Sequence, residues 1–80
     1  MPLRKHSVSI RGHRTSFSLE DEFWQELRTI AKANGSSLAA LVTRIDAKRQ
    51  PGENLSSTLR LHVLRHLRET AGLGRSQQPE

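Results

Sequence analysis

Polar side chains alternate with apolar or β-branched ones in the short run from Arg14 to Leu19. Because successive side chains of a β-strand point to opposite faces, Arg14, Ser16 and Ser18 would lie together on one face of a strand. Phe17 and Leu19 would lie on the other face and would need an apolar core. The pattern therefore predicts a strand with one packing face and one face that offers a cation and two hydroxyl groups to a polar partner.

The charge of the chain indicates what kind of partner this polar face would meet. The 80 residues include 13 Lys and Arg against 8 Asp and Glu, which gives a formal net charge of +5. The segment before Thr15 contains Arg4, Lys5, Arg11 and Arg14 and no acidic residue. Such a charge favours a polyanion such as nucleic acid. A basic protein without a polyanionic partner is the alternative, and the clustering of the cations argues against it.

We therefore expect the strand to contact DNA bases through Arg14, Ser16 and Ser18. Arginine can donate two hydrogen bonds to guanine, whereas serine pairs with any base, so Arg14 should discriminate most between sequences. Contacts to phosphate groups are expected from the basic residues that precede the strand, which are Arg4, Lys5 and Arg11.

The segment before the strand fits two structures. Residues 7–10 alternate polar and apolar side chains, and Gly12 follows them. Gly12 either sits in the turn of a hairpin or marks a bulge in one longer strand. Residues 1–13 are thus a basic arm or an extra strand, and the pattern does not decide between them.

An amphipathic helix is predicted after the strand, from about residue 20 to residue 34, because its apolar residues share one arc at 100° per residue. Ser18 and Asp21 have the spacing of a capping box, in which the serine hydroxyl accepts a hydrogen bond from the helix backbone. Ser18 would then be used twice, as a recognition residue and as a cap.

Two further helices follow. Ser37 can cap a helix over residues 38–49, and Asn54 can cap a third helix over residues 55–71. The apolar stripe of the third helix covers about half of its circumference, which indicates burial against both its own chain and a second subunit. The periodicity does not explain Arg60 inside this stripe or Leu61 outside it.

A second subunit is also expected from the size of the chain. Small chains commonly need a disulfide, a metal or a partner subunit for stability, and cysteine is absent. A lone strand leaves its backbone N–H and C=O groups unpaired. Pairing with the same strand of a second copy would give a two-stranded antiparallel ribbon of a size that fits the major groove of DNA.

The order of these elements resembles the ribbon-helix-helix repressors, the family of Arc and MetJ. The resemblance is carried by residues 14–19, by Ala33-Asn34-Gly35 at the end of the first helix, and by the following Ser36-Ser37-Leu38. It covers about residues 14–49. Residues 11–24, together with residues 54–57, resemble a bacterial subgroup with a third helix.

The resemblance implies a mostly α fold with one short N-terminal strand, an intertwined homodimer with an intersubunit antiparallel ribbon, and a third helix. It implies the same division of faces in the strand. It also implies that the N-terminus of the second helix binds a phosphate through Ser37 and the amides after it. The expected organisation is an arm or strand over 1–13, a core over 14–49, a third helix over 54–72 and a disordered tail over 73–80.

These observations predict a sequence-specific DNA-binding transcriptional regulator, a repressor, which acts as a homodimer that could assemble further along double-stranded DNA. The alternative is a protein-interaction module, such as an antitoxin, that binds a partner protein through the third helix or the tail. Catalysis is not expected, because no phosphate loop, nucleophile elbow or metalloprotease motif is present.

No cofactor, metal or membrane association is expected either. His62 and His66 stand four residues apart on one helical face, but two ligands are too few for a closed metal site. No run approaches the roughly 20 apolar residues of a membrane-spanning helix. The N-terminus lacks the apolar segment of a signal peptide, so we expect a cytoplasmic protein.

Overall fold

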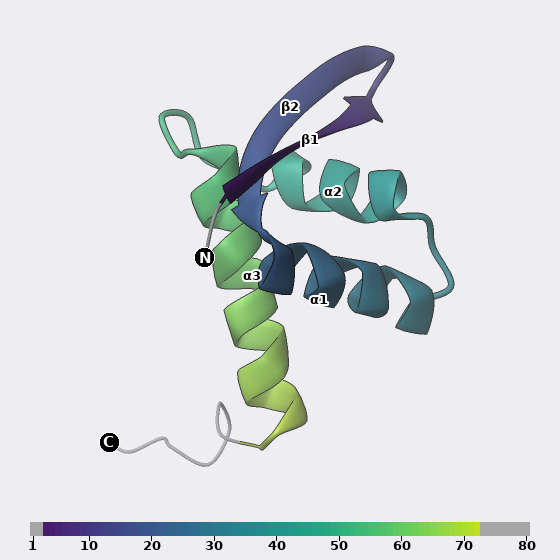
Figure 1. Cartoon of the computed structure of the whole chain (residues 1–80), viewed down its shortest axis with the longest axis vertical. Helices are drawn as coiled ribbons and strands as arrows, with labels where there is room; N and C mark the ends of the chain where they lie inside the picture. Colours follow the sequence, from purple (N-terminus) through teal and green to yellow (C-terminus); the bar gives the residue numbers. More distant parts are fainter. Residues whose placement is uncertain (1–2, 73–80) are drawn as a thin grey trace.

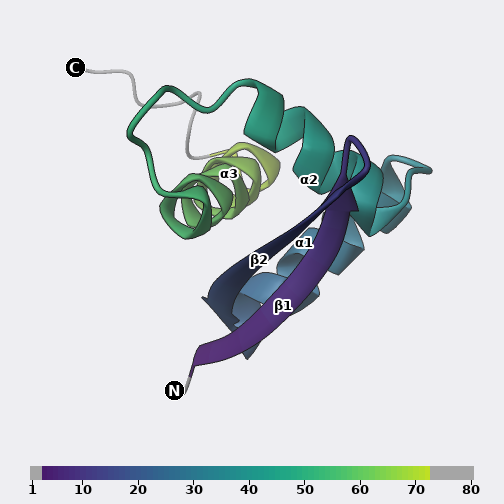
Figure 2. The same ribbon diagram turned by 90° about the horizontal axis from the view of Figure 1, so that it is seen from above.

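The computed structural model describes residues 3–72 and places a two-stranded ribbon over a group of helices (Figure 1). The strands are β1 (Leu3–Ile10) and β2 (His13–Glu20). The helices are α1 (Asp21–Ala33), α2 (Leu38–Ala47) and α3 (Leu55–Thr70). From above, the ribbon runs across α1 and α2, and α3 lies to one side (Figure 2).

The strands form a hairpin, so Gly12 lies in a turn between two strands and does not mark a bulge in one longer strand. Arg11 and Gly12 have φ angles of 52° and 82°, and positive φ at both central residues is the mark of a type I′ turn. The turn sets Ile10 opposite His13. Even-numbered positions of β1 therefore share a face with odd-numbered positions of β2, which explains why the apolar residues of the two strands have opposite parity.

The expectation of one short strand is wrong, because the chain has two strands of eight residues each. β1 begins at Leu3, so the basic segment is an extra strand rather than an arm from that residue onward. β2 pairs with β1 of the same chain. The backbone groups on one edge of β2 are thus paired within a single chain, by β1. The predicted order of a ribbon, two helices and a third helix is confirmed.

The inner face of the ribbon and the three helices share one apolar core. Phe17 and Leu19 are buried as predicted, with 6% and 0% of their surface exposed. Each helix contributes three buried apolar residues, so each helix packs against the core through its own apolar face. The buried residues of this core are Ile10, Phe17, Leu19, Leu27, Ile30, Ala31, Leu41, Val42, Ile45, Leu55, Leu59 and Val63.

The helix starts are capped at two of the three predicted places. The Ser37 hydroxyl accepts a hydrogen bond from the Ala40 amide at 3.0 Å, and the Asn54 side chain accepts one from the Ser57 amide at 3.2 Å. The capping box at Ser18 is wrong: α1 begins at Asp21, and its N-cap residue makes no side-chain cap. The physical reason is that β2 continues to the residue before the helix, so Ser18 is held extended in the ladder.

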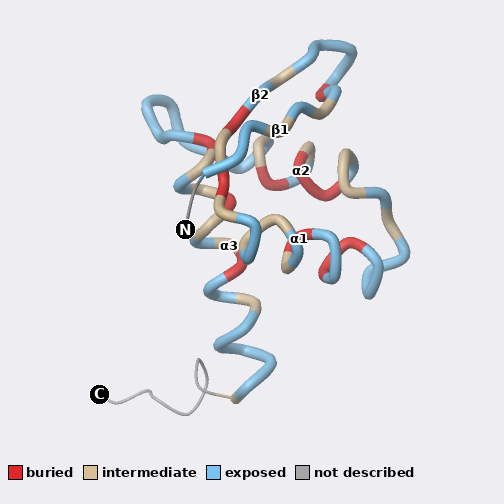
Figure 3. Tube along the Cα trace, in the orientation of Figure 1, coloured by how far each residue is buried: buried red, intermediate tan, exposed pale blue. Residues whose placement is uncertain are grey.

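The third helix is packed through its N-terminal half, and its C-terminal half extends beyond the other elements (Figures 1 and 3). Leu59 and Val63 are buried, whereas Leu64 and Leu67 are 47% and 43% exposed. The part of the broad apolar stripe that was expected to face a second subunit is therefore exposed in the single chain. α2 and α3 end at Ala47 and Thr70, slightly before the predicted residues.

Arg60, the polar residue inside the apolar stripe of α3, is explained by its contacts with other elements of the fold. Arg60 donates a hydrogen bond from Nε to Glu20 Oε1 at 3.0 Å. Its guanidinium carbon also lies 6.0 Å from the centre of the Phe23 ring, within the range of a cation–π contact. Arg60 thus occupies the stripe because it joins the end of β2 and the start of α1 to the third helix.

Candidate nucleic-acid interface

The outward face of the ribbon is the surface opposite the core. The register places Ser7 opposite Ser16, and it places Lys5 and Ser9 opposite the other two polar residues of β2. Alternation then puts all six side chains on the same face. We define the outward face as the side chains of Lys5, Ser7, Ser9, Arg14, Ser16 and Ser18. All of them are exposed except Ser18, which is half-buried.

The three predicted base-contacting residues are therefore brought together on one face, and the hairpin adds a second strand to it. Ser7 and Ser9 were not singled out from the sequence. The signal that could have found them is the two-residue turn at Arg11 and Gly12, because that turn length fixes which side chains share a face.

Ser16 forms a pair with Ser7 at the centre of this face. Their hydroxyl oxygens lie 3.1 Å apart, so one hydroxyl donates to the other. A hydroxyl has one proton and two lone pairs, so the accepting serine keeps its own proton for an outside acceptor. The pair can therefore offer both a donor and acceptors to a base edge.

Ser18 lies at the end of the outward face that is nearest to α3. Its backbone amide donates a hydrogen bond to the Ser56 hydroxyl at 3.3 Å. Its own hydroxyl does not cap α1, because the N-cap residue of that helix is Glu20. The competing use of the Ser18 side chain that the sequence suggested is thus absent.

The predicted phosphate-contacting residues are spread over the surface. Lys5 lies on the outward face, and Arg11 lies exposed in the turn. Arg4 is opposite Leu19 in the ladder and pairs through Nε with the Asp21 carboxylate at 3.1 Å. These cations are not one cluster, since they lie on the face, at the tip and near the start of α1.

Ser37 lies at the N-terminus of α2, with its hydroxyl engaged as a cap. The capping oxygen is an acceptor there, so its proton is left for an anion, and the first amides of a helix have no partner within the helix. The hairpin turn and the N-terminal end of α2 lie toward the same end of the molecule in both views (Figures 1 and 2). The turn that contains Arg11 and the start of α2 that Ser37 caps thus lie toward one end of the ribbon.

Residues 3–72 present neither a membrane-spanning helix nor a cluster of metal ligands. No helix there combines the length and apolar character needed to cross a membrane. No group of three or more His, Cys, Asp or Glu side chains in the same part of the chain could hold a metal ion.

The comparisons with known proteins agree with this arrangement. A family model described as a ribbon-helix-helix domain matches residues 3–67, which include both strands, α1, α2 and most of α3. No curated protein and no solved structure matches the chain. Since the family match covers more than half of the sequence, the chain belongs to the ribbon-helix-helix family.

Proposed function

We propose that the protein is a sequence-specific DNA-binding transcriptional repressor that inserts its ribbon into the major groove. Proteins of the ribbon-helix-helix family are in general DNA-binding regulators. The major groove of B-DNA admits a two-stranded β-ribbon, and base edges there present a pattern of donors and acceptors that differs for each base pair.

The observation that carries this proposal is the composition of the outward face. Its six side chains are two cations and four hydroxyls, and no carboxylate lies among residues 1–19. A surface of this kind attracts the phosphate backbone and can hydrogen-bond to bases without burying an apolar group in the groove. Arg14 is the strongest candidate for sequence discrimination, because its guanidinium can pair with both acceptors of guanine.

Phosphate contacts would hold the ribbon in register. The hairpin turn, with Arg11, and the start of α2, with Ser37, lie toward one end of the molecule, where both residues could meet the backbone beside the groove. Arg4 is available as well, because its pair with Asp21 is at the surface, with 67% and 52% of the two side chains exposed. An exposed ion pair contributes little to stability and is readily exchanged for a phosphate.

The functional unit in this proposal is a homodimer, supported by the open edge of β2. In a hairpin with a two-residue turn, Ile10 and His13 exchange the first hydrogen bonds, so the amides of Arg14, Ser16 and Ser18 point away from β1. The hydrogen bond from the Ser18 amide to Ser56 agrees with this direction. An open strand edge can pair with another strand, so a second copy could add at Arg14 and Ser16.

Selection of binding sites from randomised duplex DNA tests the proposal. A palindromic enriched motif is expected, because a two-fold dimer reads two equivalent half-sites. Arg14→Ala should then weaken binding to the selected site by about 1–3 kcal/mol and relax the preference at one base pair. Arg28→Ala, which removes an exposed cation of α1, is the matched control and should leave that preference unchanged.

Two outcomes would count against this function. One is the absence of any enriched motif at low salt, where binding to DNA is strongest. The other is an Arg14→Ala variant that binds every operator variant as the unchanged protein does. Light scattering tests the dimer separately, since a folded monomer at micromolar concentration would contradict it.

A protein-interaction module is the second candidate, and one observation favours it. Leu64 and Leu67 are exposed on the half of α3 that extends beyond the other elements. A partner protein could cover these side chains. If this is the main function, randomised DNA yields no motif, and Leu64→Ser with Leu67→Ser abolishes binding of the partner without unfolding the chain.

A further inference from the structure

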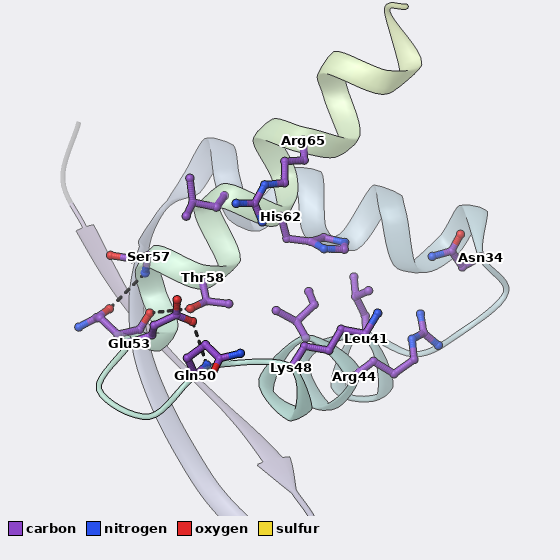
Figure 4. Close-up of a pocket in the computed structure, with 13 residues that line it drawn as sticks. Asn34, Leu41, Arg44, Lys48, Gln50, Glu53, Ser57, Thr58, His62 and Arg65 are labelled. Carbon is purple, nitrogen blue, oxygen red and sulfur yellow. Dashed lines mark hydrogen bonds between the residues drawn. The ribbon is translucent and has the colours of Figure 1, made fainter. Parts of the chain in front are cut away.

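A hollow between α2 and α3, which we term the α2–α3 pocket, takes no part in the proposed contacts with DNA (Figure 4). Its volume is about 490 Å³, within the range of sites that hold small organic molecules. The lining comes from the end of α1, from α2 and α3, and from the loop between α2 and α3. It includes Leu41, Arg44 and Lys48 on one side and Leu61, His62 and Arg65 on the other.

The pocket is rich in positive charge. Arg44 comes from α2, Lys48 is the C-cap residue that follows this helix, and Arg65 comes from the facing helix α3. Within residues 3–72, the ion pairs use other arginines, so these three cations have no carboxylate partner there. The carboxylate of Glu53, which also lines the pocket, accepts a hydrogen bond from the Gln50 amide at 2.9 Å.

His62 lies within the electrostatic reach of all three of these cations. Burial lowers the pKa of His62, and the positive charges of His66, Lys48, Arg44 and Arg65 lower it further. In the close-up, the imidazole projects from α3 into the hollow, and the side chains of Arg44 and Lys48 lie across the hollow from α3 (Figure 4). Charges from two helices therefore act on the same region of space.

The pocket also has an apolar wall. Of the lining leucines, Leu41 from α2 is buried, whereas Leu61 from α3 is 45% exposed. Leu61 is the residue that lies outside the apolar stripe of α3, and the packing of the chain does not use it. An apolar ligand surface placed against Leu61 would remove exposed apolar area from water, which is favourable.

We propose that the α2–α3 pocket binds a small organic anion, namely a carboxylate or phosphate ester on an aromatic or branched apolar body. The acidic group would lie between Arg44, Lys48 and Arg65, where charge-assisted hydrogen bonds are strongest. The apolar body would lie between Leu41 and Leu61. None of the residues proposed to contact DNA lines this pocket, so the two sites are separate.

A titration of the full chain, freed of nucleic acid, tests the proposal with two probes, 1-naphthyl phosphate and 2-naphthoate. Amide NMR spectra should show saturable shifts centred on the pocket for at least one probe. Uncharged 2-naphthol should bind at least about tenfold more weakly, since it cannot make the charge-assisted bonds. Bound anion should also raise the pKa of His62, because a nearby negative charge favours the protonated imidazole.

Matched variants locate the site. Arg65→Gln should weaken binding of the anionic probe by about fivefold or more, whereas Arg68→Gln, on the same helix but outside the lining, should not change it. Leu61→Ala should weaken binding of the naphthyl group, and Leu64→Ala, which removes a similarly exposed leucine, should not. All four residues are exposed, so the variants are expected to fold.

Three results would overturn the inference. The first is that neither anion gives a saturable shift. The second is that the shifts centre on the ribbon or on the start of α2, which would mean that the anion occupies the DNA-binding surface. The third is that Arg65→Gln and Leu61→Ala bind the probes as well as their controls do.

Discussion

Arg60 and Glu20 stand 40 positions apart in the chain, and the arginine Nε donates to the carboxylate Oε1 at 3.0 Å. The contact joins α3 to the last residue of β2. A second contact joins the same two elements, since the Ser56 hydroxyl accepts a hydrogen bond from the Ser18 amide. The third helix therefore fixes the end of the ribbon that lies away from the turn, and with it the outward face.

The first prediction concerns the Arg60–Glu20 contact. The hydrogen bond from Arg60 lowers the pKa of Glu20, so Arg60→Gln should raise the pKa of that carboxyl toward its ordinary value. A carboxyl with a lowered pKa adds stability above its ordinary pKa, and this stability is lost as the pH falls through the lowered value. The variant should thus lose less stability on acidification. Carbon NMR titration of Glu20 measures the pKa, and an unchanged value would refute the contact.

The second prediction concerns the Ser56 hydroxyl. Ser56→Ala leaves the Ser18 amide without its partner, so it should cost about 1 kcal/mol of unfolding free energy relative to Ser57→Ala. The neighbouring Ser57 has an exposed side chain on the same turn, so both variants gain the same helix propensity. Urea denaturation measures the difference, and hydrogen exchange at the Ser18 amide should be faster in Ser56→Ala alone. Equal stabilities would contradict the bond.

The third prediction concerns the place of α3 in the core. Leu59 is fully buried, so Leu59→Ala should destabilise the protein by about 2–5 kcal/mol through lost contacts and a cavity. Leu64→Ala, on the extended half of the helix, should change stability by no more than about 0.5 kcal/mol. Thermal unfolding followed by circular dichroism compares the two. A small effect of Leu59→Ala would mean that α3 is not part of the folded unit.

The fourth prediction concerns the tip of the ribbon. Arg11 has a φ of 52°, a conformation that Asn adopts more readily than Arg. Arg11→Asn should therefore raise the unfolding free energy by about 0.5–1 kcal/mol and weaken DNA binding, because a cation is lost. Arg11→Lys keeps both the charge and the strain, so it should change neither quantity by much. If Arg11→Asn gains stability and binds DNA as tightly as the unchanged protein does, then Arg11 does not contact DNA.

The fifth prediction concerns His62. Because burial lowers the pKa of His62 in the folded protein, the unfolded chain binds a proton at this residue more readily. Stability should therefore fall as the pH drops through the ordinary histidine pKa of about 6.5. His62→Gln should lessen this fall between about pH 7.5 and about pH 5.5, the range in which histidine titrates. If the melting temperatures of the unchanged protein and of His62→Gln depend on pH in the same way, this role of His62 is disproved.

The helices were predictable because their signals are local. The caps at Ser37 and Asn54 are both present, and the buried residues of each helix lie on the arcs that periodicity indicates. The division of faces in β2 was predictable for the same reason, since alternation alone decides it. The outward position of Arg14 and Ser16 follows from that pattern.

The remaining features depend on contacts between distant segments. An Arg-Gly turn is not among the strongest hairpin signals, so the sequence did not decide between a hairpin and a bulge, and Ser7 and Ser9 were missed. The false cap at Ser18 arose because the ladder with β1 keeps that residue extended. Arg60 and Leu61 looked misplaced because their surroundings, Glu20 and the α2–α3 pocket, come from other elements.

The contact of Ser56 with β2 also bears on how the protein avoids unlimited sheet growth. A hairpin has two open edges, and a chain that exposes both can stack into a fibre. Here α3 blocks one edge of β2 near Ser18 and leaves only a short stretch for pairing. If both copies use that same stretch, the open edges of the dimer are those of β1, and each carries the charged Lys5, which disfavours pairing with a further strand. The contact that joins α3 to β2 thus also occupies part of the strand edge that a further strand could use.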